Sequence, residues 1–148
     1  MTKELVLSKL EELGFALEES GEYSYMFKYE GLTILYMPDD DDENFLRFAV
    51  PNIFDVTDEN KQMVLEIVNE TNMTIKNSKT CVYCDDVWII SEYRTFDDGH
   101  LDEILEHVMR LLQATFYLFY RKIEGDDIFP DEDGDDTENN ENENKEDE

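Results

Sequence analysis

Four hydrophobic residues within the first fourteen positions recur at helical intervals, with Lys and Glu between them. They are Leu5, Val6, Leu10 and Leu13. This spacing predicts an amphipathic helix over residues 2–14. Thr2 is a suitable cap for its beginning. Gly14 can end it, since glycine tolerates the left-handed conformation that often follows a helix.

The positions that follow favour strands. Residues 23–29 carry an aromatic side chain at every second position, which is the pattern of a strand with one aromatic face. A tight turn at residues 30–31 leads into a second strand, residues 32–37, because its glycine accepts the positive φ that such turns require. Residues 45–50 favour a third strand, which we expect to stop at Pro51.

Two further strands are predicted after a second helix. Thr57 is a suitable N-cap for that helix, which we expect to end near residues 69–72. Residues 74–84 then favour a strand with an irregularity at residues 77–78. After a short turn, residues 87–94 favour the last strand.

A long amphipathic helix closes the predicted domain. It covers roughly residues 100–122 and begins after a cap at Asp97 or Asp98. The predicted fold class is therefore α+β, with a mainly antiparallel sheet of about five strands and three helices in the order α-β-β-β-α-β-β-α. We expect residues 1–123 to form this single domain. Residues 124–148 are predicted to be a disordered acidic tail, since they offer almost nothing to bury.

Charge narrows the choice of partners. The 148 residues include 39 acidic and 12 basic side chains, a formal net charge of −27. Residues 124–148 contribute 14 of the acids and one base, so the predicted domain is acidic as well. Binding to nucleic acid requires clustered Lys and Arg, and we predict neither nucleic-acid nor membrane binding. The chain shows no signal-peptide pattern and no long apolar run, so we expect a cytoplasmic protein.

Few residues are candidates for chemistry. Cys81 and Cys84 have the spacing of a redox or zinc pair, but side chains three apart on a strand point to opposite faces, and no second pair accompanies them. His100, Glu103 and His107 share one helix face and could chelate a divalent metal. They support an alternative, a small metal-dependent hydrolase. The main prediction assigns no catalytic, metal-binding or cofactor-binding residue and requires no cofactor.

Two acidic runs resemble calcium-binding loops. They are residues 39–43 and 131–136. Aligning Gly134 with the conserved glycine of an EF-hand puts Phe129 where the first ligand belongs, so the match fails. Polar surface is the better interpretation. Such a surface also leaves open a further alternative, an acidic inhibitor or immunity-type protein that blocks a basic partner.

Two strands are apolar on both faces. In residues 32–37 and 87–90 the alternation of hydrophobic and polar positions is lost. Either the three helices divide between the two faces of the sheet, or one face contacts a second copy or a client chain. The possible interface residues are Tyr36, Trp88, Tyr117, Phe119 and Tyr120. The expected partner is a protein, most readily a second copy in a homodimer.

Several short sequence segments resemble those of the YbjN-like family, whose fold is similar to that of type III secretion chaperones. They are Asn52-Ile53-Phe54-Asp55, Val87-Trp88-Ile89-Ile90-Ser91-Glu92 and Asp98-Gly99-His100-Leu101, with the aromatic end of the last helix. The resemblance covers about residues 3–122. It implies a helix-flanked, mainly antiparallel sheet, frequently dimeric, that holds partner proteins or regulates them. The family offers no catalytic residues to carry over. We therefore predict a non-enzymatic, chaperone-like or regulatory adaptor.

Overall fold

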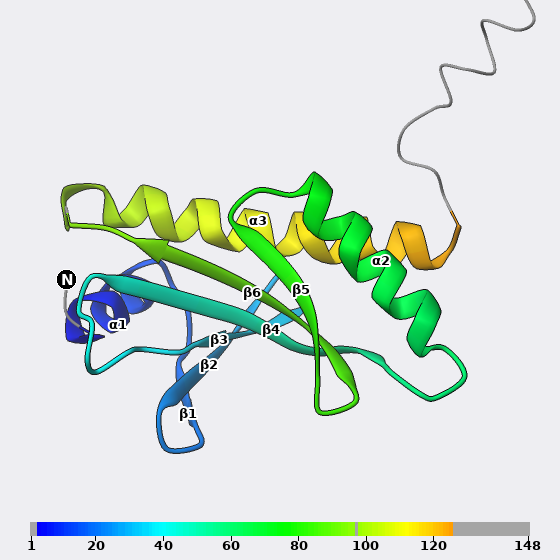
Figure 1. Cartoon of the computed structure of the whole chain (residues 1–148). Coiled ribbons are helices and arrows are strands. Elements are labelled where there is room, and N and C mark those ends of the chain that lie inside the picture. The colour runs from blue at the N-terminus through cyan, green and yellow to red at the C-terminus, as the bar shows by residue number, and fades with distance from the viewer. Residues whose placement is uncertain (1–2, 97, 126–148) are drawn as a thin grey trace, which may run out of the picture.

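Six antiparallel strands form one sheet in the computed structural model, which describes residues 3–96 and 98–125 (Figure 1). The strands lie in the order β1-β2-β3-β4-β6-β5. They are β1 (Glu18–Ser20), β2 (Ser24–Tyr29), β3 (Leu32–Tyr36), β4 (Phe45–Asp55), β5 (Ser78–Tyr83) and β6 (Asp86–Arg94). The helices are α1 (Lys3–Glu12), α2 (Lys61–Thr74) and α3 (Leu101–Ile123), and a 3-10 turn, Asp98–His100, precedes α3. The α+β class with an antiparallel sheet and three helices is confirmed.

The sheet has one strand more than the sequence predicts. The additional strand, β1, contains three residues and pairs with β2 from Glu18 opposite Met26 to Ser20 opposite Ser24. Its residues are acidic or small and show no hydrophobic alternation. The strand forms because the chain reverses at Gly21, whose φ is +69°.

Pro51 does not end the third predicted strand. β4 runs on to Asp55, and its register with β6 shifts between Val50 and Phe54. Asn52 has a φ of +54° within this irregularity. A proline cannot donate a hydrogen bond to the ladder, so it is tolerated where the ladder is interrupted. The shift brings Phe54 opposite Val87 of β6.

The ends of the helices also differ from the predicted ones. Thr57 and Asn60 exchange hydrogen bonds in a turn before α2. The Asn60 side chain accepts from the Thr57 N–H at 2.8 Å, and the Thr57 hydroxyl accepts from the Asn60 N–H at 3.3 Å. The helix itself begins at Lys61 and continues to Thr74. The predicted caps Thr2 and Asp97 lie outside the described residues. His100 stands at the N-cap position of α3 and makes no side-chain capping hydrogen bond.

The core lies between the sheet and the helices. Ile34 of β3, Phe48 of β4 and Ile89 of β6 point to it from adjacent strands. Leu112, near the middle of α3, is fully buried there. Two buried hydroxyls are paired with each other: the Thr115 hydroxyl lies 3.0 Å from the Ser78 hydroxyl and also donates to the Leu111 carbonyl at 2.7 Å. Because these strand residues point into the core, the alternate residues of the same strands lie on the other face of the sheet.

Candidate interaction surface

All three helices pack on the same face of the sheet. Leu10 of α1, Val64 of α2 and Leu112 of α3 belong to one buried cluster. In Figure 1 the sheet is viewed from its other side, with α3 behind it. No helix among the described residues covers that side, which we call the open face. It is formed by Met26, Leu35, Ala49, Lys79, Cys81, Tyr83, Trp88 and Ile90. The alternative that the helices divide between the two faces is therefore wrong.

One row of cross-strand neighbours crosses the whole open face. Side chains directly opposite each other in antiparallel strands lie on the same side of the sheet. Following these pairs gives the row Glu18, Met26, Leu35, Ala49, Ile90 and Lys79. Ala49 and Leu35 are buried within it, and Met26 and Ile90 are half-buried. The middle of the open face is thus apolar and its two ends are charged.

An aromatic pair lies at one end of the open face. The rings of Tyr83 and Trp88 meet edge to face, with centroids 5.5 Å apart. Tyr83 is exposed and Trp88 is half-buried. Cys81 stands opposite Trp88 in the register, and burial raises the pKa of its thiol, partly opposed by Lys79. Tryptophan and tyrosine in such a setting are frequent anchors of protein interfaces.

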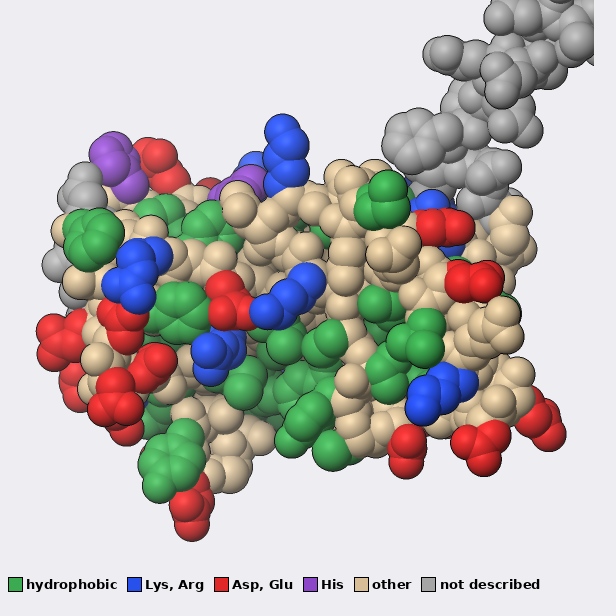
Figure 2. Space-filling model, viewed as in Figure 1, with side chains coloured by type: hydrophobic (Ala, Val, Ile, Leu, Met, Phe, Trp, Pro, Cys, Tyr) green, Lys and Arg blue, Asp and Glu red, His purple; other side chains and the backbone are tan. Residues whose placement is uncertain are grey.

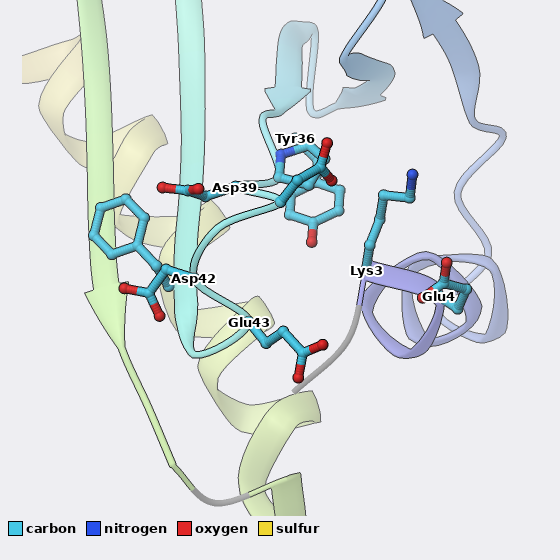
Figure 3. A pocket seen from close by; sticks show the side chains of 9 residues that line it. Lys3, Glu4, Tyr36, Asp39, Asp42 and Glu43 are labelled. Carbon is cyan, nitrogen blue, oxygen red and sulfur yellow. The ribbon is translucent and has the colours of Figure 1, made fainter.

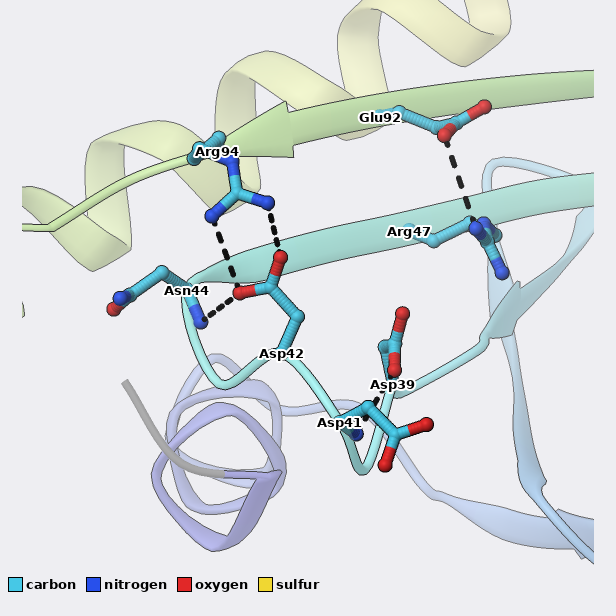
Figure 4. A network of polar contacts seen from close by, with 7 residues as sticks. All are labelled: Asp39, Asp41, Asp42, Asn44, Arg47, Glu92 and Arg94. Carbon is cyan, nitrogen blue, oxygen red and sulfur yellow. Dashed lines mark hydrogen bonds and ion pairs between the residues drawn. The ribbon is translucent and has the colours of Figure 1, made fainter.

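Ion pairs border the apolar middle. Glu92 lies 2.6 Å from the Lys79 ammonium and 3.9 Å from the Arg47 guanidinium. Asp42 pairs with Arg94 and also accepts a hydrogen bond from the Asn44 N–H at 3.2 Å (Figure 4). A polar border around an apolar centre is the usual anatomy of a protein–protein contact.

Basic residues are gathered on this face of an acidic protein. Lys28, Arg47, Lys79 and Arg94 all occupy outward positions of β2, β4, β5 and β6. Figure 2 shows hydrophobic side chains in the middle of this view with Lys and Arg beside them. One acidic side chain lies among these bases, and most of the others lie farther out. The open face therefore differs in charge from the rest of a chain whose net charge is −27.

The outer edge of the sheet is blocked at β5. The Thr80 N–H donates to the Asn72 side-chain oxygen at 2.7 Å, and the Asn72 amide donates to the Thr80 carbonyl at 3.0 Å. Asn72, on α2, thus takes the place that a neighbouring strand would occupy. At the opposite edge, β1 is only three residues long and acidic. Pairing of a further strand at either edge is disfavoured.

Removing this block should open the β5 edge. We expect Asn72→Ala to lose about 1–3 kcal/mol of folding free energy, because the backbone groups of Thr80 are left without partners. Asn69→Ala is the matched control, since Asn69 is exposed on the same helix and donates its side-chain hydrogen bond to Met73 of that helix. Urea unfolding measures both. Equal midpoints for the two variants would show that the Asn72 contacts are not needed.

A hollow of about 200 Å³ lies at the acidic turn between β3 and β4 (Figure 3). It is lined by Lys3, Glu4, Tyr36, Pro38, Asp39, Asp40, Asp42, Glu43 and Phe45. Burial, followed by the nearby Glu4 carboxylate, raises the pKa of Tyr36 above its ordinary value. Among the described residues no three His, Cys, Asp or Glu side chains are placed to hold a metal ion. The acidic run therefore forms a solvated turn in the described part of the chain.

The histidine cluster is not assembled as a metal site. His100 Nδ1 lies 3.7 Å from a Glu103 carboxylate oxygen, and both side chains are largely exposed. His107 instead packs its ring against Tyr93, with centroids 6.1 Å apart. The described residues thus provide no support for the metal-dependent hydrolase.

The structure separates the five predicted interface residues. Tyr36 and Phe119 are buried in the chain's own core, with 2% and 0% of their surface exposed. Tyr120 is half-buried and its hydroxyl donates to the Ile53 carbonyl. Tyr117 is 53% exposed on α3, and Trp88 lies on the open face. An interface role for Trp88 stays a prediction.

Of the residues that form the open face, only Trp88 was predicted from the sequence as an interface residue. The residues not predicted are Met26, Leu35, Ala49, Lys79, Cys81, Tyr83 and Ile90. Ile90 belongs to the strand whose two faces are both apolar, and this loss of alternation in the sequence did indicate Ile90. Tyr83 and Met26 join the surface only through the pairing of strands, which no local pattern reveals.

Comparison with known proteins gives the fold. No protein-family model matches the chain, and no curated protein matches its sequence. The crystal structure of YbjN from E. coli, described as a proposed transcription regulator, has a TM-score of 0.61 at 11% identity, over 82% of this chain and 92% of that one. An uncharacterized protein from Methanothermobacter thermautotrophicus has a TM-score of 0.54 at 12% identity, over 82% and 99%. The chain has a YbjN-like fold, as the resemblance implied.

Within residues 3–96 and 98–125 no helix combines the length and the apolar character needed to cross a bilayer.

Proposed function

We propose that this protein is a non-enzymatic adaptor or regulatory protein that binds a protein chain on its open face. One observation carries the proposal: a sheet with every described helix on one side bears an apolar row and an aromatic pair on the other. A surface of this kind with a charged border is typical of protein contacts.

The edges of the sheet support a contact through the face. Asn72 occupies the backbone groups of Thr80 at one edge, and the other edge is a short acidic strand. A partner that added a strand would have to displace Asn72. A partner that packs on the side chains of Met26, Trp88 and Ile90 does not have to displace any of the described residues.

The first occupant that we expect is a second copy of the chain. The apolar row ends at Glu18 on one edge and at Lys79 on the other. Two open faces related by a twofold axis along the strands place each Lys79 near the partner's Glu18. This arrangement is self-complementary, as a symmetric dimer requires.

Light scattering over a concentration series tests this form of the proposal. The average mass should rise from 17.5 kDa toward twice that value at micromolar concentrations. The charge arrangement would make the association weaken in high salt. A mass that stays at 17.5 kDa throughout would exclude the second copy as the partner.

One observation favours a second candidate, the acidic inhibitor. The hollow between β3 and β4 presents Glu4, Asp39, Asp40, Asp42 and Glu43 together. A basic partner would bind there rather than on the open face. Replacing Asp39 and Asp40 with asparagine should weaken binding in that case, and should leave a contact on the open face unchanged.

A further inference from the structure

The hollow between β3 and β4 carries negative charge that the described residues neutralise only in part. Its acidic lining residues are Glu4, Asp39, Asp40, Asp42 and Glu43. Of these, only Asp42 has an ion pair within the described part of the chain, with Arg94. Lys3 also lines the hollow, but its ammonium group lies over the Tyr25 ring, 6.0 Å from the ring centroid. The other carboxylates can therefore receive a cation from outside.

A buried hydroxyl points into the same hollow. Tyr36 is 2% exposed, and its ring stacks on that of Phe48 with centroids 5.1 Å apart. Figure 3 shows the Tyr36 hydroxyl directed into the space between Glu43 on the turn and Glu4 at the start of α1. No hydrogen bond joins this hydroxyl to another described residue, although a polar group on a buried side chain usually has a partner.

This hydroxyl is suited to accept a hydrogen bond. Burial, followed by the nearby Glu4 carboxylate, raises the pKa of Tyr36, so the phenol keeps its proton at neutral pH. A neutral phenol oxygen accepts through its lone pairs. An acceptor without a partner, surrounded by carboxylates, indicates a ligand that brings both positive charge and N–H donors.

The size and walls of the hollow distinguish between cations. Its volume of about 200 Å³ is far more than a single water or a bare ion needs. Among the described residues no three His, Cys, Asp or Glu side chains are placed to hold a metal ion. Tyr36, Pro38 and Phe45 contribute apolar walls. A guanidinium group is planar, weakly hydrated and stacks on aromatic rings, whereas an ammonium group is compact and strongly hydrated. The walls therefore favour guanidinium.

The same turn already binds one guanidinium group of the chain. Arg94 Nη1 lies 3.3 Å from Asp42 Oδ1, and Nη2 contacts Oδ2, so both nitrogens of the fork pair with one carboxylate (Figure 4). Asp39 accepts a hydrogen bond from the Asp41 N–H at 2.9 Å, which holds the turn in shape. Pairing through two nitrogens is strong because the guanidinium fork matches a carboxylate.

We propose that the hollow between β3 and β4 binds the guanidinium group of an arginine residue in a basic partner protein. The N–H groups of that arginine donate to the Tyr36 hydroxyl and to the carboxylates beside it. This inference rests on the second candidate function, the acidic inhibitor, and names the side chain that its partner brings. It does not involve the open face.

Three short blocked peptides test the assignment on the full chain: Gly-Arg-Gly, Gly-Lys-Gly and the same peptide with citrulline, the uncharged analogue of arginine. NMR shifts of the backbone amides of residues 39–44 report binding. We expect the dissociation constant of the arginine peptide to be at least about fivefold lower than that of the lysine peptide. The citrulline peptide should not bind. The shifts caused by the arginine peptide should shrink in about 1 M salt, where the screening length is about 3 Å.

Two pairs of variants test the residues that form the site. Tyr36→Phe keeps the ring and removes only the hydroxyl, and should raise the dissociation constant of the arginine peptide about threefold or more. Tyr29→Phe is its control, since Tyr29 is half-buried and lies outside the hollow. Glu43→Gln should also weaken binding, whereas Glu59→Gln, at an exposed position before α2, should not. The same spectra show whether each variant is folded.

Four results would overturn the inference. Equal binding of the arginine and lysine peptides would do so and would leave the second candidate standing, because general attraction between acid and base explains both. An unchanged dissociation constant in Tyr36→Phe would exclude the hydroxyl. Ethylguanidinium that binds more than about tenfold tighter than the arginine peptide would show that the hollow excludes a side chain carried by a protein. Shifts at Tyr83 and Ile90 in place of the turn would put the peptide on the open face.

Discussion

Replacing Phe119 with alanine is expected to lower the free energy of unfolding by about 3–5 kcal/mol. Phe119 is fully buried between α3 and the sheet, where its ring contacts Phe54 and Tyr120. Truncation removes apolar contact and leaves a cavity, because a close-packed interior relaxes only in part. Urea unfolding monitored by circular dichroism measures the loss.

Tyr117→Ala is the matched control for this substitution. Tyr117 lies two residues earlier on the same helix and is 53% exposed. Its truncation should change the unfolding free energy by about 0.5 kcal/mol or less. Similar losses for the two variants would mean that the burial of α3 described above is wrong.

The second large effect is expected on association. Trp88→Glu should weaken self-association at least about 30-fold, because a central aromatic anchor is lost and a charge is placed in the contact. Ile90→Glu should act in the same direction, since Ile90 lies in the middle of the apolar row. Sedimentation equilibrium provides the dissociation constants.

Tyr117→Glu tests whether the exposed end of α3 shares in that contact. Tyr117 lies on a helix that packs against the other side of the sheet, so we expect the dissociation constant to stay within about twofold of the wild type. If Tyr117→Glu weakened self-association as much as Trp88→Glu, the contact would lie on the helix layer and not on the open face.

Periodic patterns were sufficient to predict most of the elements. The helical spacing of Val6 and Leu10 and the alternation of Tyr25, Phe27 and Tyr29 each reflect burial on one side of a single element. A local pattern of this kind depends only on which side of its own helix or strand is buried. For that reason the three helices, five of the strands and the fold class were recoverable from the chain alone.

The failures have a common physical origin in long-range pairing. β1 exists only as the partner of β2, and β4 passes Pro51 because β6 remains available beyond the irregularity. Asn72 lies where the sequence predicted the second helix to end. In the structure α2 continues past it, and the Asn72 side-chain amide hydrogen-bonds to the backbone of Thr80 in β5. None of these contacts is encoded within one segment.

The candidate site could be predicted only in part for the same reason. The apolar character of both faces of residues 87–90 indicated a contact surface and selected Trp88. It did not show on which side the helices pack. In the row of residues 117–120, hydrophobicity alone could not separate exposed Tyr117 from buried Phe119. Strand order and the packing of α3 decide both questions.

Alkylation of the two cysteines tests the open face most directly. Cys81 lies on the open face opposite Trp88, whereas Cys84 is exposed in the turn between β5 and β6. We expect the alkylation rate at Cys81 to fall several-fold as the average mass doubles, with the alkylation rate at Cys84 nearly unchanged. A doubled mass with an unchanged rate at Cys81 would place the contact elsewhere and contradict the account.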